Sequence, residues 1–223
     1  SSEGRKNPEY LEGLLLSYEN YIQDTSKGLN FTHAAELAAV MMEKFRVSQK
    51  WTTTFAEIMN RMNLKDPVVV VKTWGTIFGI LVNLVENRDD LLSALLDSQN
   101  PQIGLDLFIH TMMCLAADMR TKIEILHKHL DNQKPSFQAL ALRKLKPLMD
   151  REFLREVAWS LCEKYQTIDL QSQSASEYWS NLERSMQFAL NMQAISEIAA
   201  FTEDDENAKK FNQKSLEVLE AVT

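Results

Sequence analysis

Glycine and proline are scarce in this chain, which has six glycines and five prolines among 223 residues. A protein of many short strands needs these two residues in its tight turns, so their scarcity argues against an all-β fold. No segment alternates apolar and polar residues convincingly for more than four residues. The ten methionines and the abundant Leu, Ala, Glu, Gln and Lys are good helix formers. The composition therefore predicts an all-α protein.

Cysteine and positive charge are also in short supply. The two cysteines, Cys114 and Cys162, lie in apolar stretches without a CxxC partner, so we expect two buried, reduced thiols. That expectation favours a cytoplasmic or nuclear location. With 24 basic against 31 acidic residues the net charge is −7, which argues against general affinity for nucleic acid or anionic membranes.

The motifs of common enzyme classes are missing. There is no glycine-rich nucleotide loop, no GxSxG nucleophile elbow and no HExxH pair. Glu124 and His127 have the ExxH spacing of di-iron bundles, but the second copy which that chemistry requires is absent. We interpret this pair as part of a solvated polar face, and His110 as a core or groove histidine. The sequence therefore predicts a non-enzymatic protein with no cofactor and no metal.

The longest apolar run, "DPVVVVKTWGTIFGILVNLVEN", resembles a membrane span at first sight. Gly75 and Gly79 even have the spacing that lets membrane helices dimerise. However, Lys72 and Asn83 interrupt the run, and a span needs about 20 predominantly apolar residues. We therefore expect a buried helix covered on nearly all sides, whose glycines let a neighbouring helix approach closely, and no membrane partner.

Three prolines give the clearest sign of internal organisation. Pro67, Pro101 and Pro135 are each separated from the next by 34 residues, and "LLDSQNP" and "HLDNQKP" share the pattern Leu-Asp-x-Gln-x-Pro. A fixed period of this length is typical of stacked supersecondary units, and 34 residues accommodate two antiparallel helices. Because proline suits the first turn of a helix, we expect a helix to begin at each of the three.

These signals predict a stack of about five antiparallel helix pairs, an α-solenoid in which neighbouring pairs share a continuous core. A flexible tail is expected over residues 1–8, and a single helical-repeat domain over 9–223. We also expect Thr202 and Asp205 to form a capping box at the start of the last helix. The predicted elements are a capping helix at 9–24 and helix pairs at 32–63, 67–97, 101–131, 135–166 and 174–222.

In architecture the chain resembles armadillo and HEAT-type helical repeat proteins. The segment "WGTIFGILVNLVENRDDLLSALL" looks like the apolar helix, short polar turn and following helix of such a unit. Five helix pairs in a chain of this length are also similar to the middle domain of the eukaryotic translation-initiation scaffold proteins, and the likeness covers roughly residues 32–201. The resemblance implies a binding scaffold.

Basic residues concentrate between Arg120 and Lys164, a segment with a net charge of +4 that leaves −11 on the rest of the chain. We expect the centre of this segment to form a basic edge at one helix-to-helix turn, suited to an acidic peptide or a phosphate backbone. The alternative is a solvated rim in which Arg151 and Arg155 pair locally with Glu152 and Glu156. The residues of the basic edge are Arg143, Lys144, Lys146, Arg151 and Arg155.

The sequence thus predicts an adaptor or scaffold that binds a peptide or helix of another protein through a helical-repeat surface. One alternative is a translation or RNA-processing scaffold that binds RNA and protein through the basic edge. Aromatic residues are not interleaved with the basic ones, which counts against specific RNA recognition. The other alternative is an all-helical regulator of a small GTPase.

Overall fold

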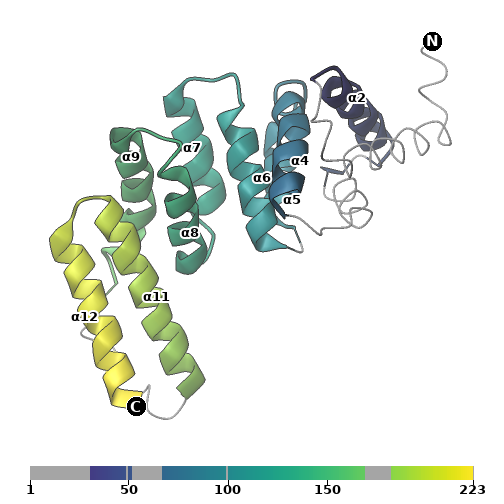
Figure 1. Cartoon of the computed structure of the whole chain (residues 1–223). Coiled ribbons are helices and arrows are strands. Elements are labelled where there is room, and N and C mark those ends of the chain that lie inside the picture. The colour runs from purple at the N-terminus through teal and green to yellow at the C-terminus, as the bar shows by residue number, and fades with distance from the viewer. Residues whose placement is uncertain (1–30, 49, 52–66, 99, 169–181, 223) are drawn as a thin grey trace. The chain divides into compact units, whose positions relative to one another are not determined.

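The computed structural model describes residues 31–48, 50–51, 67–98, 100–168 and 182–222. In these ranges it contains nine α-helices, one short 3-10 helix and no strand (Figure 1). The all-α prediction is therefore confirmed. The capping helix expected at 9–24 and the second helix expected in 32–63 lie outside the described residues.

The helices fall into two compact units, Ser1–Ala117 and Asp118–Thr223. The single domain expected over residues 9–223 stays a prediction. In the first unit the helices are α2 (Phe31–Ser48), α4 (Pro67–Leu81), α5 (Arg88–Leu96) and α6 (Pro101–Met113). In the second unit they are α7 (Met119–Leu130), α8 (Pro135–Leu145), α9 (Arg151–Cys162), the 3-10 helix η2 (Glu163–Tyr165), α11 (Leu182–Phe201) and α12 (Asp205–Val222).

All three periodic prolines begin a helix, as their spacing predicted. Pro67 opens α4, Pro101 opens α6 and Pro135 opens α8. The first N–H groups of a helix have no partner inside the helix, so a residue without an N–H costs nothing there, and its fixed φ is already helical. The residue before Pro101 adds a cap, because Oδ1 of Asn100 accepts a hydrogen bond from the backbone N–H of Ile103 at 3.3 Å.

In the first unit α4 packs against α2 and α6, and α6 also packs against α5. The glycines of α4 allow a close approach, as expected. A β-carbon on Gly75 would lie 2.7 Å from Cδ2 of His110, and one on Gly79 would lie 2.9 Å from Cβ and Sγ of Cys114. His110 is therefore a packing residue of the α4–α6 contact.

The apolar run that forms α4 is buried on one side and open at its start. Trp74 and Phe78 are fully buried in the core, whereas Val68 is 73% exposed. The expected cover on nearly all sides is therefore wrong for the first turn of the helix. None of the helices in the described ranges has the length and apolar character that crossing a membrane would require.

Asn83 has a structural role that the sequence did not reveal. Its Nδ2 donates to the carbonyl oxygens of Gly79 at 3.0 Å and Cys114 at 3.1 Å, and its Oδ1 accepts from the N–H of Ala116 at 2.8 Å. One side chain thereby joins the carboxyl ends of α4 and α6, where backbone groups lack partners within the helix.

In the second unit α11 packs against α8, α9 and α12, and α7 packs against α9. Figure 1 shows α11 and α12 running antiparallel. Two buried or half-buried serines join this pair through hydrogen bonds to backbone carbonyls. Ser196 Oγ donates to the carbonyl of Ala208 at 2.7 Å, and Ser215 Oγ donates to the carbonyl of Ala189 at 2.8 Å.

The capping box expected from Thr202 to Asp205 is not formed. Thr202 Oγ1 instead donates to the carbonyl of Ala199 at 2.6 Å, so the threonine closes α11. Asp204 starts the next helix, because its Oδ1 accepts from the N–H of Asn207 at 3.1 Å. This backbone hydrogen bond lowers the pKa of Asp204 below its usual value.

The two cysteines differ in environment. Cys162 is buried, as expected, and burial raises the pKa of its thiol. Cys114 is exposed, contrary to expectation, because it lies at the C-cap of α6, where the helix ends. Neither cysteine forms a disulfide.

Candidate basic cavity

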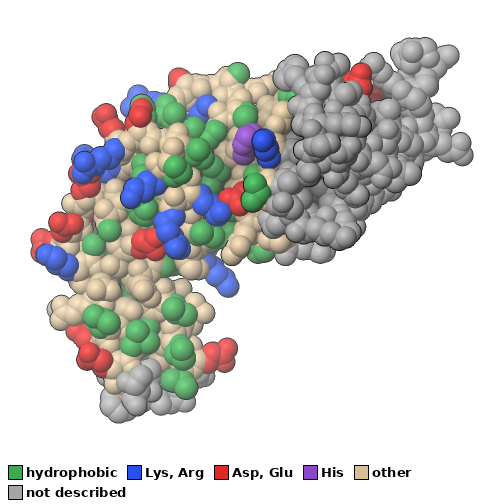
Figure 2. All heavy atoms as spheres, viewed as in Figure 1, with side chains coloured by type: hydrophobic (Ala, Val, Ile, Leu, Met, Phe, Trp, Pro, Cys, Tyr) green, Lys and Arg blue, Asp and Glu red, His purple; other side chains and the backbone are tan. Residues whose placement is uncertain are grey.

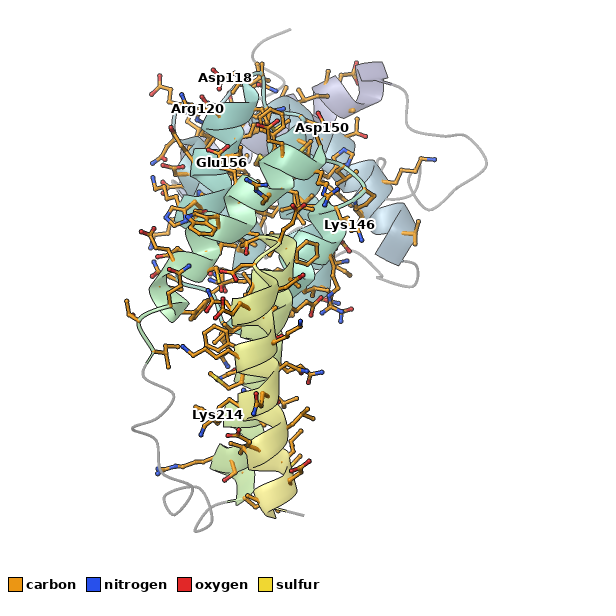
Figure 3. The ribbon with its side chains drawn as sticks, turned by 90° about the vertical axis from the view of Figure 1, so that its left-hand side faces the viewer. Asp118, Arg120, Lys146, Asp150, Glu156 and Lys214 are labelled. Carbon is orange, nitrogen blue, oxygen red and sulfur yellow. The ribbon has the colours of Figure 1, made fainter. Side chains whose placement is uncertain are left out.

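The predicted basic edge surrounds one turn of the second unit. Arg143 and Lys144 lie in the last turn of α8, Lys146 follows that helix, and Arg151 and Arg155 lie in α9. Figure 3 shows Lys146 and Asp150 on the turn between the two helices. The expected location at a helix-to-helix turn is therefore correct.

Three of these five residues line a cavity of about 650 Å³ between the α8–α9 turn and the end of α11. Its volume falls in the range of sites that hold small molecules or a few side chains. The apolar part of its lining consists of Met149, Leu154, Ala200 and Phe201. The charged part consists of Arg143, Lys146, Arg151, Glu197 and Glu203. We call this site the basic cavity.

The acids that pair with the arginines come from α11 and the residues that follow it. Arg143 Nε lies 3.0 Å from Oε1 of Glu197. Arg151 donates from both Nε and Nη2 to Oε1 of Glu203, each at 2.5 Å, and Arg155 Nη1 lies 3.7 Å from Oε2 of the same carboxylate. Within the described ranges, the local pairs expected between these two arginines and the neighbouring glutamates of α9 are not formed, and Glu203 takes their place.

Lys146 and Lys144 differ from the three arginines. Lys146 is exposed, lines the cavity and makes no ion pair with any residue that the structure describes. Lys144 is half-buried and does not line the cavity. The lining therefore has three cations and two anions, and Lys146 is the cation available to a ligand without competition.

Glu203 has an unusual backbone conformation. Its φ is 65°, in the left-handed region, two residues after the end of α11. Glycine or asparagine is common at this position of a helix end, since a β-carbon there costs roughly 1–2 kcal/mol. Nothing in the sequence indicates this conformation, because Glu203 lies in an acidic run, "TEDDEN", without glycine.

On the face seen in Figure 2, basic and acidic side chains alternate with apolar ones instead of forming one large block of positive charge. In the lining of the cavity, Glu197 and Glu203 likewise accompany the three cations. Exposed ion pairs of this kind stabilise a fold by about 0–1 kcal/mol each. An incoming carboxylate can therefore replace one of them at little cost.

The ExxH pair, Glu124 and His127, is not part of a metal site within the described residues. Glu124 is exposed on α7, and His127 is half-buried there with an unpartnered Nδ1. Among the residues that the structure describes, no three His, Cys, Asp or Glu side chains are arranged to hold a metal ion.

Comparison with protein-family models, with curated proteins and with solved structures finds no match for this chain. The function therefore has to be inferred from the chemistry of the basic cavity.

Proposed function

We propose that this protein is a non-enzymatic adaptor, built as a stack of helix pairs, that binds a segment of a partner protein in the basic cavity. The segment has a large apolar residue next to acidic residues. The main support is that one cavity combines an apolar floor with a rim on which cations outnumber anions. The cytoplasm or nucleus is the proposed location.

The helix contacts inside each unit support a stacked architecture. In the first unit α4 and α6 begin 34 residues apart and pack against each other. In the second unit α7 packs against α9, and α8 packs against α11. Contacts between corresponding helices of successive pairs are what a stack of armadillo or HEAT type requires.

The cavity lining supports a protein segment as the ligand. Met149 and Leu154 are buried at 8% and 6% exposure, and half-buried Phe201 adds an aromatic face. An apolar side chain entering this space would remove its own surface from water, which supplies about 25 cal/mol per Å². Lys146 and the arginines would bind the acidic neighbours and set the orientation.

A peptide-display selection tests the proposal. Random peptides of about twelve residues are panned against the folded chain, and enriched sequences should combine an aromatic or large aliphatic residue with Asp or Glu. The double variant Arg143→Glu and Lys146→Glu should weaken their binding by at least about tenfold. Lys209→Glu combined with Lys210→Glu is the matched control, because both exposed lysines lie on α12 outside the cavity lining.

Two outcomes would contradict the proposal. One is a failure to enrich acidic-apolar sequences, or an enrichment of peptides that bind the double variant as tightly as the wild type. The other is tight binding of single-stranded RNA with a steep salt dependence that the same double variant abolishes. That second result would replace the adaptor with the RNA-binding alternative.

A further inference from the structure

Glu203 connects two arginines at the edge of the basic cavity. Its Oε1 accepts two hydrogen bonds from Arg151, and its Oε2 lies 3.7 Å from Arg155. Its own backbone N–H donates to the carbonyl of Ala200 at 3.2 Å, which ties the residue to the end of α11. One carboxylate thus occupies the guanidinium groups that an acidic ligand would otherwise bind.

The backbone at this position does not favour glutamate. With φ at 65° the residue adopts the left-handed conformation in which glycine is preferred. Glycine would make the same backbone hydrogen bond and would relieve the conformational strain. What glutamate supplies and glycine lacks is the carboxylate, so the ion pairs with the arginines are the distinguishing property of this residue.

These ion pairs are open to exchange. The side chains of Arg151 and Arg155 are 85% and 59% exposed, and that of Glu203 is 42% exposed. Water and salt therefore screen the attraction, and a ligand carboxylate can approach both arginines from solvent. Once Glu203 is displaced, Arg151 joins Lys146 as an unpaired cation of the cavity lining, and Arg155 lies one helical turn further along α9.

We infer that Glu203 is an internal competitor for the acidic group of the partner segment. In the free protein its carboxylate occupies Arg151 and Arg155, and in the complex a carboxylate of the partner takes its place. This inference rests on the proposed function. It predicts that the protein binds an acidic ligand more weakly than it would if Glu203 carried no carboxylate.

The test uses a defined probe, a fluorescein-labelled peptide of about ten residues with a Leu-Phe pair between glutamates. Binding is followed by fluorescence anisotropy at low salt. Glu203→Gln removes the charge while keeping a similar shape, and it should tighten binding by about threefold to tenfold, since the lost competition is that of an exposed ion pair. Glu206→Gln is the matched control, because it removes one negative charge from the exposed surface of α12 and should leave affinity within about twofold.

Two further variants show whether the gain depends on the arginines and on the fold. Combining Glu203→Gln with Arg151→Gln should remove the gain, because the site that was freed is gone. Glu203→Gly also removes the carboxylate and relieves the left-handed backbone, so it should fold at least as well as Glu203→Gln and show the same gain. Circular dichroism verifies that each variant is folded.

The outcomes separate this inference from the proposed function. If the wild-type protein binds the peptide, Lys146→Glu weakens binding, and Glu203→Gln binds no tighter than Glu206→Gln, the competitor role is overturned while the adaptor role stands. If the wild-type protein and Glu203→Gln both fail to bind, both proposals are overturned. Binding by Glu203→Gln alone would support strong competition by the internal carboxylate.

Discussion

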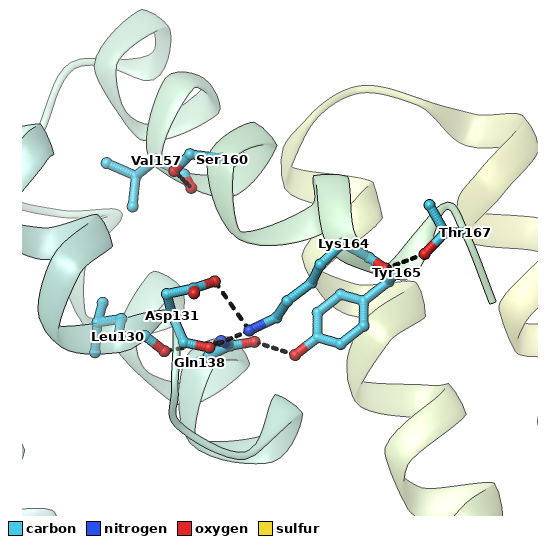
Figure 4. Close-up of polar contacts among 8 residues, drawn as sticks. All are labelled: Leu130, Asp131, Gln138, Val157, Ser160, Lys164, Tyr165 and Thr167. Carbon is cyan, nitrogen blue, oxygen red and sulfur yellow. Dashed lines mark hydrogen bonds and ion pairs between the residues drawn. The ribbon is translucent and has the colours of Figure 1, made fainter.

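The phenol of Tyr165 donates a hydrogen bond of 2.6 Å to Oε1 of Gln138, a residue 27 positions earlier in the chain (Figure 4). Gln138 is fully buried, and its Nε2 donates to the carbonyls of Leu130 at 2.8 Å and Asp131 at 3.1 Å. The side chain therefore satisfies the carboxyl end of α7 from the first turns of α8. Lys164 adds a hydrogen bond to the carbonyl of Asp131 and an ion pair of 3.0 Å to its Oδ1.

Removing the amide of Gln138 should destabilise the second unit. In Gln138→Ala, the carbonyls of Leu130 and Asp131 and the Tyr165 hydroxyl each lose a hydrogen bond in a buried or half-buried setting. We expect a loss of about 2–3 kcal/mol in the free energy of unfolding. Tyr165→Phe should cost about 1 kcal/mol, because it leaves only Oε1 of Gln138 without its donor. Urea unfolding followed by circular dichroism measures both losses. Unchanged stability of Gln138→Ala would show that this network does not support the fold.

Alkaline pH should weaken the same region. Burial, followed by the charge of Asp131, raises the pKa of Tyr165 from 10.0 to about 12. Since the folded state holds this proton more tightly than the unfolded state, the stabilisation is fully present below about pH 10 and is lost as the pH rises toward 12. Phenolate absorbance should show one tyrosine titrating late in the wild type and not in Tyr165→Phe. A Tyr165 signal that titrates near pH 10 would contradict the prediction.

A methyl group at Gly75 should disturb the contact of α4 with α6. The β-carbon of Gly75→Ala would meet the His110 ring at 2.7 Å, so the ring has to move. We expect a net loss of about 1–2 kcal/mol from overpacking, even though alanine favours a helix by about 1 kcal/mol over glycine. Combining Gly75→Ala with His110→Ala should recover much of the loss that Gly75→Ala causes. Thermal unfolding of the four proteins measures this coupling, and a Gly75→Ala variant more stable than wild type would refute the packing argument.

Asp118 should stabilise the start of α7 more strongly when it is ionised than when it is protonated. Its Oδ1 accepts from the N–H of Thr121 at 2.8 Å, and this hydrogen bond lowers the pKa of the carboxyl below 3.8. Asp118→Ala should therefore be less stable than wild type at neutral pH, with a difference that shrinks as the pH falls through the pKa of the folded state. Asp118→Asn should retain part of the cap without that pH dependence. Urea titrations at neutral and acid pH measure both effects, and a difference independent of pH would contradict the role of the charge.

Local chemistry made the helix starts predictable. Proline has a fixed φ and no N–H, so Pro67, Pro101 and Pro135 indicated three helix starts without reference to the rest of the fold. The spacing of Gly75 and Gly79 likewise predicted a close helix contact, because both glycines lie on one face of α4. The same logic failed at Thr202, where the end of one helix and the start of the next compete for a single hydroxyl.

The repeat in sequence also concealed a difference in structure. Gly104 and Gln138 occupy the same place, three residues after their prolines. A β-carbon on Gly104 would lie 2.3 Å from the carbonyl oxygen of Leu95, so the backbone itself approaches the preceding helix. At Gln138 a long side chain reaches the carbonyls of the preceding helix instead. The period was readable from the sequence, but these two kinds of contact depend on the distance between helices.

By itself the sequence determined the all-α class, the helix starts at the prolines and the concentration of basic residues around one turn. These features follow from backbone chemistry and from residues that are neighbours in the chain. Only the tertiary structure decided what faces the basic residues. Glu203 pairs with Arg151 across 52 positions, and the apolar floor of the cavity combines α9 with the end of α11. Such pairs form because packing brings distant helices together, and no spacing within a single helix encodes them.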